Sequence, residues 1–417
     1  MRAIAPSGPA KQSSRASRRI CTYNPRPMAF RIIHVVDTTT SEDSVEALAA
    51  LLRSEAADAS MASHEIAVLG HRSTGALLEA AGISGAGTGS RKIHWLRSLG
   101  WLDPVGWRAL AKLVDPSRPM LLHAWGLPAA LACAIGGSSA GRVVTLGEGP
   151  LTLPQTALDT IDRGSWRRGQ RKGRGVQWTG FTREVVEALV EAGVPRQRVA
   201  HVPLGLEEKV GQPREIERKE LREQLGLVPE DGPVFLLAGD ARPQSRHDYG
   251  LWAAGIVQQL FPRVRVIVRE DLRNRRDHGL ERLFNSMGDP DLPVVAPAEI
   301  SWQRLLGIAD VLMVTADGPV PMGAAIAAMM AGVPVVGTPI ATVREVLEDG
   351  HTGLIARSMK ARALAARVEE LLADGELRNR LIKAAREESR SRHGAADMVK
   401  CLRSLYAMGA VAAPAGV

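Results

Sequence analysis

Short apolar runs alternate with amphipathic stretches along most of the chain. Within residues 42–53, apolar residues recur at helical spacing, which predicts an amphipathic helix capped by the polar residues before it. Apolar runs of strand length lie at 31–36, 65–69, 92–96, 119–123 and 142–146, each followed by a plausible helix. Strands that alternate with helices of ten or more residues are typical of a doubly wound parallel sheet, so the first half is predicted to be α/β.

The second half repeats this alternation. Further apolar runs lie at 176–182, 233–238, 264–268, 311–314 and 333–336, and helices are predicted at 218–225, 362–373, 376–390 and 395–408. A polar segment that contains Pro213 and runs to Glu217 has the composition of an interdomain linker. The expected organisation is an extension at 1–27, domains at 28–207 and 208–394, and a last helix with its tail at 395–417.

The stretch 308–352 forms one strand-helix-strand unit in this interpretation. Val311–Val314 is an apolar run, Met322–Ala331 is a helix of small residues closed by Gly332, and a second apolar run follows. Such a unit places two parallel strands side by side. Ligands of open α/β sheets bind where the helix begins, beyond the carboxyl ends of the strands. Gly323 and Ala324 would let a ligand approach the backbone there, although small residues also suit tight helix–sheet packing.

Two runs within this stretch carry a resemblance. Residues 329–336 read MMAGVPVV and residues 344–355 read REVLEDGHTGLI. They resemble the pattern E-A-M-A-x-G-x-P-V-V followed by x-E-V-V-x-D-G-x-x-G of the GT-B glycosyltransferases of family four. The resemblance extends more weakly from Arg31 to about Met408. It implies two Rossmann-like parallel-sheet domains that face each other across a cleft, a nucleotide sugar bound between them, and a last helix that crosses back to the first domain.

The chain departs from the family at two glutamates that flank the donor sugar and ribose. When the motifs are aligned through residues 332–334, these positions hold Pro319 and Ala327. Asp317 is the nearest acid, so it is either a substitute catalytic carboxylate or a residue that solvates the loop. Three functions stay open: a retaining, metal-independent glycosyltransferase without a cofactor, a degenerate relative that binds a nucleotide or sugar or serves as a partner subunit, and a basic binding protein for anionic lipid or nucleic acid.

The resemblance also assigns a set of donor-binding residues. Residues 239–246 occupy the place of the family's G-R-L-x-x-x-K-G, whose cations contact the donor diphosphate. Here Arg246 stands at the lysine position and Arg242 lies one position late, and a guanidinium can hold a phosphate on two hydrogen bonds. The expected donor-binding residues are Gly239, Arg242, Arg246, Glu299, Gly323 and Ala324. Glu299 belongs to a segment against which family members stack the nucleobase, and the base, UDP- or GDP-linked, stays open.

Acceptor-side candidates lie at the carboxyl ends of the first-domain strands. Asp37 and Thr38 begin a loop that is glycine-rich in the family and faces the acceptor, but this loop contains no glycine. His123 and Trp125 fall at another strand end, where the histidine would either hydrogen-bond a sugar hydroxyl or be satisfied by the backbone. Glu148 lies between two glycines, which leave its carboxylate accessible to position an acceptor hydroxyl or act as a base.

Charge indicates which kinds of partner suit the chain. The formal net charge is +8 over 417 residues, which favours anionic partners such as sugar nucleotides, acidic lipid or nucleic acid. Six cations and no acid lie within residues 163–174, a density that favours peripheral association with an anionic membrane, although such a loop is usually only solvated. No nucleic-acid-binding motif accompanies this loop, so specific nucleic-acid binding is not expected.

The remaining composition bears on location. No apolar run approaches the roughly 20 residues that a bilayer-spanning helix needs. Three cysteines, far apart and without metal or disulfide spacing, favour a reducing compartment, so a cytoplasmic protein is expected, peripheral at the inner membrane face if the basic loop binds lipid. The basic segment 1–27 is expected to be disordered, and Met28 is an equally plausible start of translation.

Overall fold

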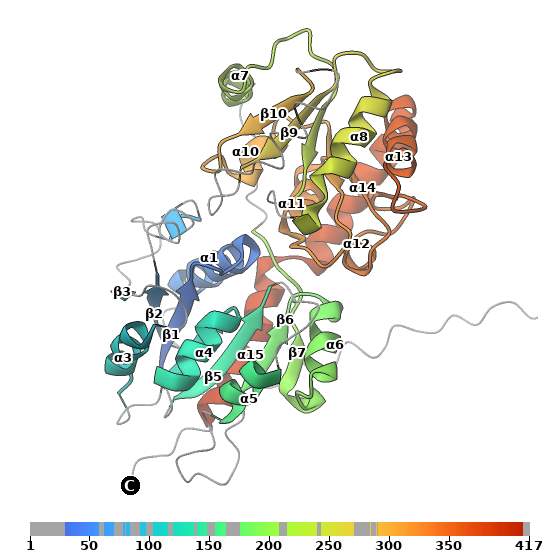
Figure 1. Ribbon diagram of the computed structural model, residues 1–417. Helices are drawn as coiled ribbons and strands as arrows, with labels where there is room; N and C mark the ends of the chain where they lie inside the picture. The colour runs from blue at the N-terminus through green and yellow to red at the C-terminus, as the bar shows by residue number, and fades with distance from the viewer. Residues whose placement is uncertain are drawn as a thin grey trace, which may run out of the picture.

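A computed structural model shows two α/β domains, which lie one above the other in Figure 1. The structure describes residues 30–57, 62–70, 78–79, 81–83, 92–96, 103–115, 120–136, 140–147, 155–163, 176–207, 215–239, 243–270, 284, 289 and 291–411. The predicted extension at 1–27 and the basic loop at 163–174, apart from Arg163, lie outside these residues.

The first domain contains a sheet of parallel strands with helices between them. Its elements are β1 (Phe30–Asp37), α1 (Glu42–Ala57), β2 (Ala62–Leu69), β3 (Ile93–Leu96), α3 (Pro104–Leu113), β4 (Met120–Trp125), α4 (Leu127–Gly136), β5 (Gly141–Leu146), α5 (Gln155–Arg163), β6 (Gln177–Gly180), α6 (Arg183–Glu191) and β7 (Val199–His201). Among the described residues the strand order is β3-β2-β1-β4-β5-β6-β7, and each neighbouring pair is parallel. This confirms the doubly wound sheet that the alternation predicted.

The second domain repeats the architecture. Its elements are α7 (Glu215–Gln224), β8 (Val234–Leu237), α8 (His247–Val257), β9 (Arg265–Arg269), β10 (Pro293–Ala296), α10 (Trp302–Leu306), β11 (Val311–Val314), α11 (Gly323–Ala331), β12 (Val335–Gly337), α12 (Ala341–Val346), β13 (Leu354–Ile355), α13 (Ala361–Ala373) and α14 (Gly375–Arg392). Within the described part of the chain the strand order is β10-β9-β8-β11-β12-β13, again parallel.

The strand-helix-strand unit at 308–352 is confirmed. Strands β11 and β12 pair in parallel, and seven of the nine residues of α11 are buried between the sheet and its neighbours. Gly332 ends the helix in the left-handed conformation, with a φ of 79°, and its N–H returns to the last turn. Only glycine adopts this conformation without a steric cost, which explains why the helix stops there.

The start of helix α7 differs from the prediction. Helix α7 begins at Glu215, three residues before the predicted start at Arg218. Two acids, Glu215 and Glu217, occupy its first turn, where the partial positive charge of a helix N-terminus favours carboxylates. The predicted linker is therefore shorter, because its acidic end belongs to the helix.

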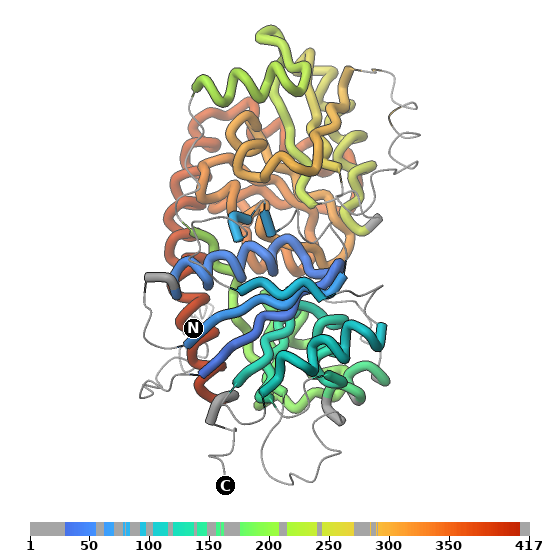
Figure 2. The backbone as a smooth tube through the Cα atoms, turned by 90° about the vertical axis from the view of Figure 1, so that its left-hand side faces the viewer, coloured from blue at the N-terminus to red at the C-terminus, as the bar shows by residue number. Residues whose placement is uncertain are grey.

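The two domains are joined by two chain crossings that lie side by side. Leu206, after β7, pairs with the segment after α14: its N–H donates to the carbonyl of His393 (2.8 Å) and its carbonyl accepts from the N–H of Ala395 (3.0 Å). The last helix, α15 (Ala395–Val411), then packs on α1, β4 and β5 of the first domain. In Figure 2 the segments at the red end of the colour bar, α14 and α15, run from the upper domain down along the lower one. The implied return of the last helix to the first domain is confirmed.

A buried polar network anchors α15 to the first sheet. The ring nitrogens of His123 lie 2.7 Å from the hydroxyl of Tyr406 on α15 and 2.7 Å from the hydroxyl of Thr145 on β5. About one turn earlier on the same helix, Arg403 donates to the carboxylate of Glu55 on α1 (2.6 Å). Buried polar groups need such partners, and these contacts therefore fix the position of α15.

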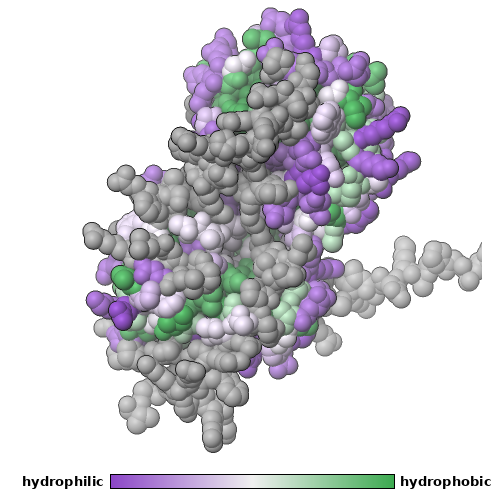
Figure 3. Space-filling view, viewed as in Figure 1, coloured by the Kyte–Doolittle hydropathy of each residue, from purple (hydrophilic) through white to green (hydrophobic). Residues whose placement is uncertain are grey.

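The surface view adds one feature of the second domain. In Figure 3 hydrophilic residues cover much of the upper domain, and apolar residues appear in separate patches. Trp252 and Ile256 on α8 are among the exposed large apolar residues. In the described part of the chain, every helix is too short or too polar to span a bilayer.

The buried histidine predicts a pH-dependent stability. Burial lowers the pKa of His123 to about 3. Between pH 6.5 and 3 the unfolded chain then binds a proton here that the folded chain does not, so stability should fall with falling pH by about 1.4 kcal/mol per unit. In His123→Gln, denaturant unfolding between pH 7 and 5 should show a slope smaller by this amount. An unchanged slope in His123→Gln would contradict this expectation.

Candidate active site

The carboxyl ends of strands from both sheets meet at the boundary between the domains. The first turn of α1, which follows β1, reaches the second domain through two acids. Glu42 accepts hydrogen bonds from Arg269 at the end of β9 (2.8 Å to each carboxylate oxygen) and from the indole N–H of Trp302 (2.9 Å). Asp43 accepts from the backbone N–H of Gly323 (2.9 Å). The ligand-binding edge of the second sheet is thus in contact with the first domain.

The N-terminus of α11 is built for the close approach of another group. Gly323 and Ala324 are buried in its first turn. A Cβ placed on Gly323 would lie 2.1 Å from Oδ1 of Asp43, far inside van der Waals contact. The approaching group is therefore a carboxylate of the protein itself, seated where the positive end of a helix favours an anion.

Arg246 lies at the start of α8 in an unusual conformation. Its backbone is left-handed, with a φ of 47°, and its guanidinium lies 3.6 Å from the centroid of the Tyr249 ring. It donates to Asp248 through Nε and Nη2 (2.9 Å each) and to Asp317 through Nη1 (2.7 Å). The hydrogen bonds that Arg246 donates to Asp248 raise the pKa of Arg246 and lower the pKa of Asp248. The structure thus brings together Arg246 and Asp317, two residues selected separately from the sequence.

The other donor-side candidates are placed less fully. Gly239 follows β8 with a φ of 88°, and a Cβ there would meet the hydroxyl of Ser245 at 2.9 Å, so glycine lets the turn before Arg246 fold back. Glu299 is exposed in the loop after β10. Arg242 and the candidate base Glu148 lie outside the residues that the structure describes.

The expectation that His123 and Trp125 face an acceptor is not met. Both side chains are fully buried, and the two ring nitrogens of His123 are occupied by Tyr406 and Thr145. The histidine is satisfied inside the protein, by two side-chain hydroxyls and not by the backbone that the alternative named. The sequence indicated these residues as site candidates because they end a strand. The partner of His123, Tyr406 on α15, is 283 positions away, so no local pattern indicates the pairing.

The remaining acceptor-side pair shapes the loop after β1. The carboxylate of Asp37 is buried and accepts from the N–H and the hydroxyl of Thr39 (2.6 Å each). Thr38 is half-buried, and its methyl group packs where Gly70 leaves room. Through this turn the pair sets the direction in which α1 leaves the sheet.

Sequence reasoning missed the residues that join the domains at this edge. Glu42 and Asp43 carry the ordinary signal of a helix N-terminus, and nothing near them in the chain points to a second domain. Arg269 has a signal in the sequence, because it is a cation that ends an apolar strand run. In the structure its side chain is buried, with 4% of its surface exposed. Its guanidinium also donates to the carbonyl of Ala298 (2.7 Å) and lies 5.0 Å from the centroid of the Trp302 ring.

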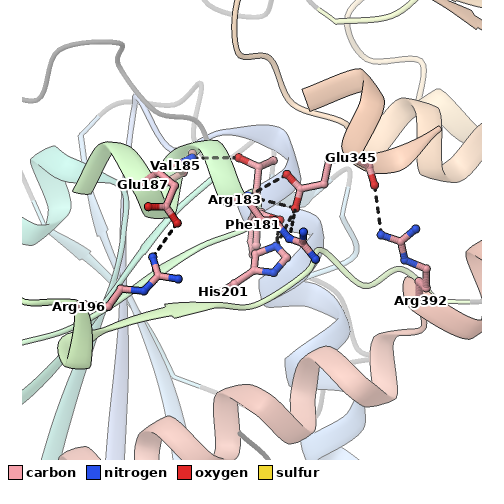
Figure 4. A network of polar contacts seen from close by, with 9 residues as sticks. Phe181, Arg183, Val185, Glu187, Arg196, His201, Glu345 and Arg392 are labelled. Carbon is pink, nitrogen blue, oxygen red and sulfur yellow. Dashed lines mark hydrogen bonds and ion pairs between the residues drawn. The ribbon is translucent and has the colours of Figure 1, made fainter. Parts of the chain in front are cut away.

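A second interdomain contact lies beside the chain crossings (Figure 4). Glu345 on α12 accepts from the N–H of Arg183, the first residue of α6 (2.8 and 3.1 Å), and from Nε2 of His201 on β7 (3.1 Å). Burial acts to raise the pKa of Glu345, but the hydrogen bonds from His201 and Arg183 outweigh it and the net pKa is lowered. Each domain thus places a carboxylate at a helix N-terminus of the other.

No cation site accompanies these carboxylates in the described residues. Among them, no group of three or more His, Cys, Asp and Glu side chains is arranged to hold a metal ion. The polar groups at this edge instead pair with one another.

Substitution of Gly323 tests the first contact. In Gly323→Ala the new methyl group should displace the Asp43 carboxylate, and loss of this charged hydrogen bond should lower the free energy of unfolding by about 1–3 kcal/mol. Gly318→Ala is the matched control, since a Cβ at Gly318 meets nothing within 4 Å. Equal stability of the two variants by denaturant unfolding would show that the contact contributes nothing.

Substitution of Glu345 tests the second contact. Because the folded pKa is lowered, this carboxylate should stabilise the fold above its ordinary pKa near 4.5, and the contribution should vanish as pH falls through the folded value. Glu345→Gln should cost about 1–3 kcal/mol at pH 7, and its deficit relative to the wild type should shrink below about pH 4.5. Glu187→Gln, at an exposed ion pair on α6, should change stability by less than about 1 kcal/mol.

Comparison with known proteins agrees with this architecture. Residues 299–388 match the family model described as glycosyl transferases group 1. The chain is 27% identical over 251 residues to the alpha-D-kanosaminyltransferase of Streptomyces kanamyceticus, covering 58% of this chain and 62% of the relative. It is 26% identical over 215 residues to the D-inositol 3-phosphate glycosyltransferase of Paenarthrobacter aurescens (strain TC1), covering 50% and 51%. The matched stretches thus span about half to three-fifths of these relatives.

Solved structures of low sequence identity share the whole fold. The Anabaena protein Alr3699/HepE in complex with UDP and glucose has a TM-score of 0.72 at 17% identity, with 91% of this chain and 99% of that chain covered. The sucrose-phosphate synthase of Thermosynechococcus elongatus has a TM-score of 0.65 at 15% identity, with 91% and 98% covered. The chain therefore has the GT-B fold, and its residues 299–388 carry the sequence pattern of the glycosyl transferases group 1.

Proposed function

We propose that this chain is a glycosyltransferase that moves a sugar from a nucleotide-sugar donor to an acceptor. The observation that carries the proposal is the β11–α11 unit, which lies within the segment matched by the family model and has a buried small-residue N-terminus facing the other domain. Two relatives are named as glycosyltransferases, and a structural neighbour was solved with UDP and glucose. These likenesses support a nucleoside-diphosphate sugar as the donor.

In the proposed donor complex the diphosphate lies between α11 and Arg246. The N-terminus of α11 supplies N–H groups and a partial positive charge, and the guanidinium supplies the positive charge that the leaving diphosphate needs. Asp248 holds that guanidinium through two hydrogen bonds, so its plane is fixed before the donor arrives. The Asp317 carboxylate, 40% exposed, is the partner that gives way to a phosphate oxygen.

The proposed chemistry is retaining and independent of a metal ion. The departing donor phosphate would take the acceptor proton, with Arg246 stabilising the charge that develops on it. Asp317 then acts near the donor in place of the glutamates that are replaced by Pro319 and Ala327. In this proposal Arg246 and the helix N-terminus together replace the charge of a metal.

A specific observation favours a second candidate function, that of a degenerate relative which binds without turnover. Both family glutamates are replaced, and the N-terminus of α11 already holds the Asp43 carboxylate. A protein of this kind would bind a nucleotide or sugar, or act as a partner subunit, but would release no nucleotide from a nucleotide sugar. Release of UDP or GDP from an unbiased panel of nucleotide sugars separates the two functions.

Calorimetry with UDP and GDP tests donor binding directly. Loss of the charge-assisted hydrogen bonds to a phosphate in Arg246→Ala should weaken nucleotide binding at least about tenfold. Arg196→Ala removes an equal charge from an exposed pair and should bind as the wild type does. No heat from either nucleotide at millimolar concentration, together with no effect of Arg246→Ala, would contradict both the enzymatic and the degenerate cleft-binding functions.

A further inference from the structure

The paired chain crossings at Leu206 and Ala395 form the hinge between the domains, and the first turn of α1 contacts the second domain at a different place. The paired crossings at Leu206 and Ala395 follow β7 and α14, and the Glu345 contact joins α6, which follows β6, to α12. Glu42 and Asp43 follow β1, three strand positions away from β6 in the sheet order. At the usual strand spacing this separation is about 14 Å. The two interdomain contacts therefore lie at separate points along the edge of the first sheet.

The loops between these two contacts include those that the proposed function uses. In the second sheet β8 and β11 lie between β9, which carries Arg269, and β12, which precedes α12. The loops after β8 and β11 hold Arg246 and Asp317, joined by an ion pair of 2.7 Å. The acids of α1 reach this region from the first domain, Glu42 at Arg269 and Asp43 at Gly323, which follows the β11 loop.

Asp43 occupies the N–H that the proposed function assigns to a donor phosphate. Asp43 is 8% exposed and takes the N–H of Gly323, the first residue of α11. Glu42 accepts hydrogen bonds from a terminal nitrogen of the buried Arg269 and from the indole N–H of Trp302. A donor phosphate that used the Gly323 N–H would have to displace the Asp43 carboxylate, because one N–H makes one good hydrogen bond.

The arrangement of α1 shows a cost of holding these acids together. Glu46 lies one turn after Glu42 on the same face of the helix. Burial, and then the charge of Glu42, raise the pKa of Glu46. Like charges disfavour one another, so holding Glu42 and Glu46 side by side costs free energy.

We propose that the first turn of α1 is an autoinhibitory latch, in which the Asp43 carboxylate occupies the donor-phosphate position of α11 and is displaced when a nucleoside diphosphate binds. Displacement breaks the contacts of Asp43 and Glu42 together, since the two residues are adjacent, and frees the domains to turn about the hinge. The inference rests on the proposed function, because it assigns the displacing anion to the donor diphosphate.

Asp43→Asn in the full chain tests the latch, with Glu187→Gln as a variant of equal charge change at a remote exposed site. Binding of UDP, GDP and inorganic pyrophosphate is measured by calorimetry, and uridine serves as a probe without phosphate. We expect Asp43→Asn to bind at least one diphosphate about tenfold more tightly than the wild type, and uridine unchanged. Equal diphosphate affinity in wild type and Asp43→Asn, with binding present in both, overturns the latch while leaving the proposed function intact.

Small-angle scattering without ligand gives a readout that does not depend on the donor. The radius of gyration should increase in Asp43→Asn and in the double variant with Glu42→Gln, and stay unchanged in Glu187→Gln. If no diphosphate binds to any variant, the proposed function fails, and an unchanged radius of gyration then overturns the latch as well. Circular dichroism of each variant checks that both domains stay folded.

Discussion

A carboxylate of one domain at a helix N-terminus of the other is the interaction on which the arrangement of this protein depends. Asp43 of the first domain accepts from the N–H of Gly323 on α11, and Glu345 of the second domain accepts from the N–H of Arg183 on α6. Each domain thus supplies one carboxylate and one helix N-terminus. In both cases the acceptor is ionic and the donor is a backbone N–H that has no partner within its own helix. The contacts satisfy groups that each domain would otherwise leave to water, and they fix the domains at two separated points.

These contacts also explain why the domains meet through their ligand-binding edges. Helices of a parallel sheet begin at the carboxyl ends of the strands, so the positive ends of α6 and α11 point toward the same boundary. A carboxylate there is stabilised in place of a substrate anion. The same electrostatics that makes this edge suitable for a diphosphate therefore makes it suitable for the protein's own acids.

The fold was predictable from the sequence because its signals are local. Apolar runs of strand length, helical spacing and the glycine at position 332 each act within a few residues, and they located β11, α11 and β12 to within two residues. The site was predictable only in part. The candidate Arg246 follows from a motif position and the candidate Asp317 is the acid nearest the replaced glutamates, whereas the pairing of Asp43 with Gly323 spans 280 residues and has no local signal. The burial of His123 likewise depends on a tyrosine from the far end of the chain.

The side-by-side crossings at Leu206 and Ala395 have a consequence for how this protein can be divided. The amino-terminal lobe takes its last helix from the carboxyl terminus, so it is discontinuous in the chain. A fragment that stopped at the first crossing would expose the surface on which α15 packs and would leave the His123 imidazole without the Tyr406 hydroxyl. Recombination that exchanged lobes between relatives would have to carry both segments, and the two lobes are in that sense inherited as a unit.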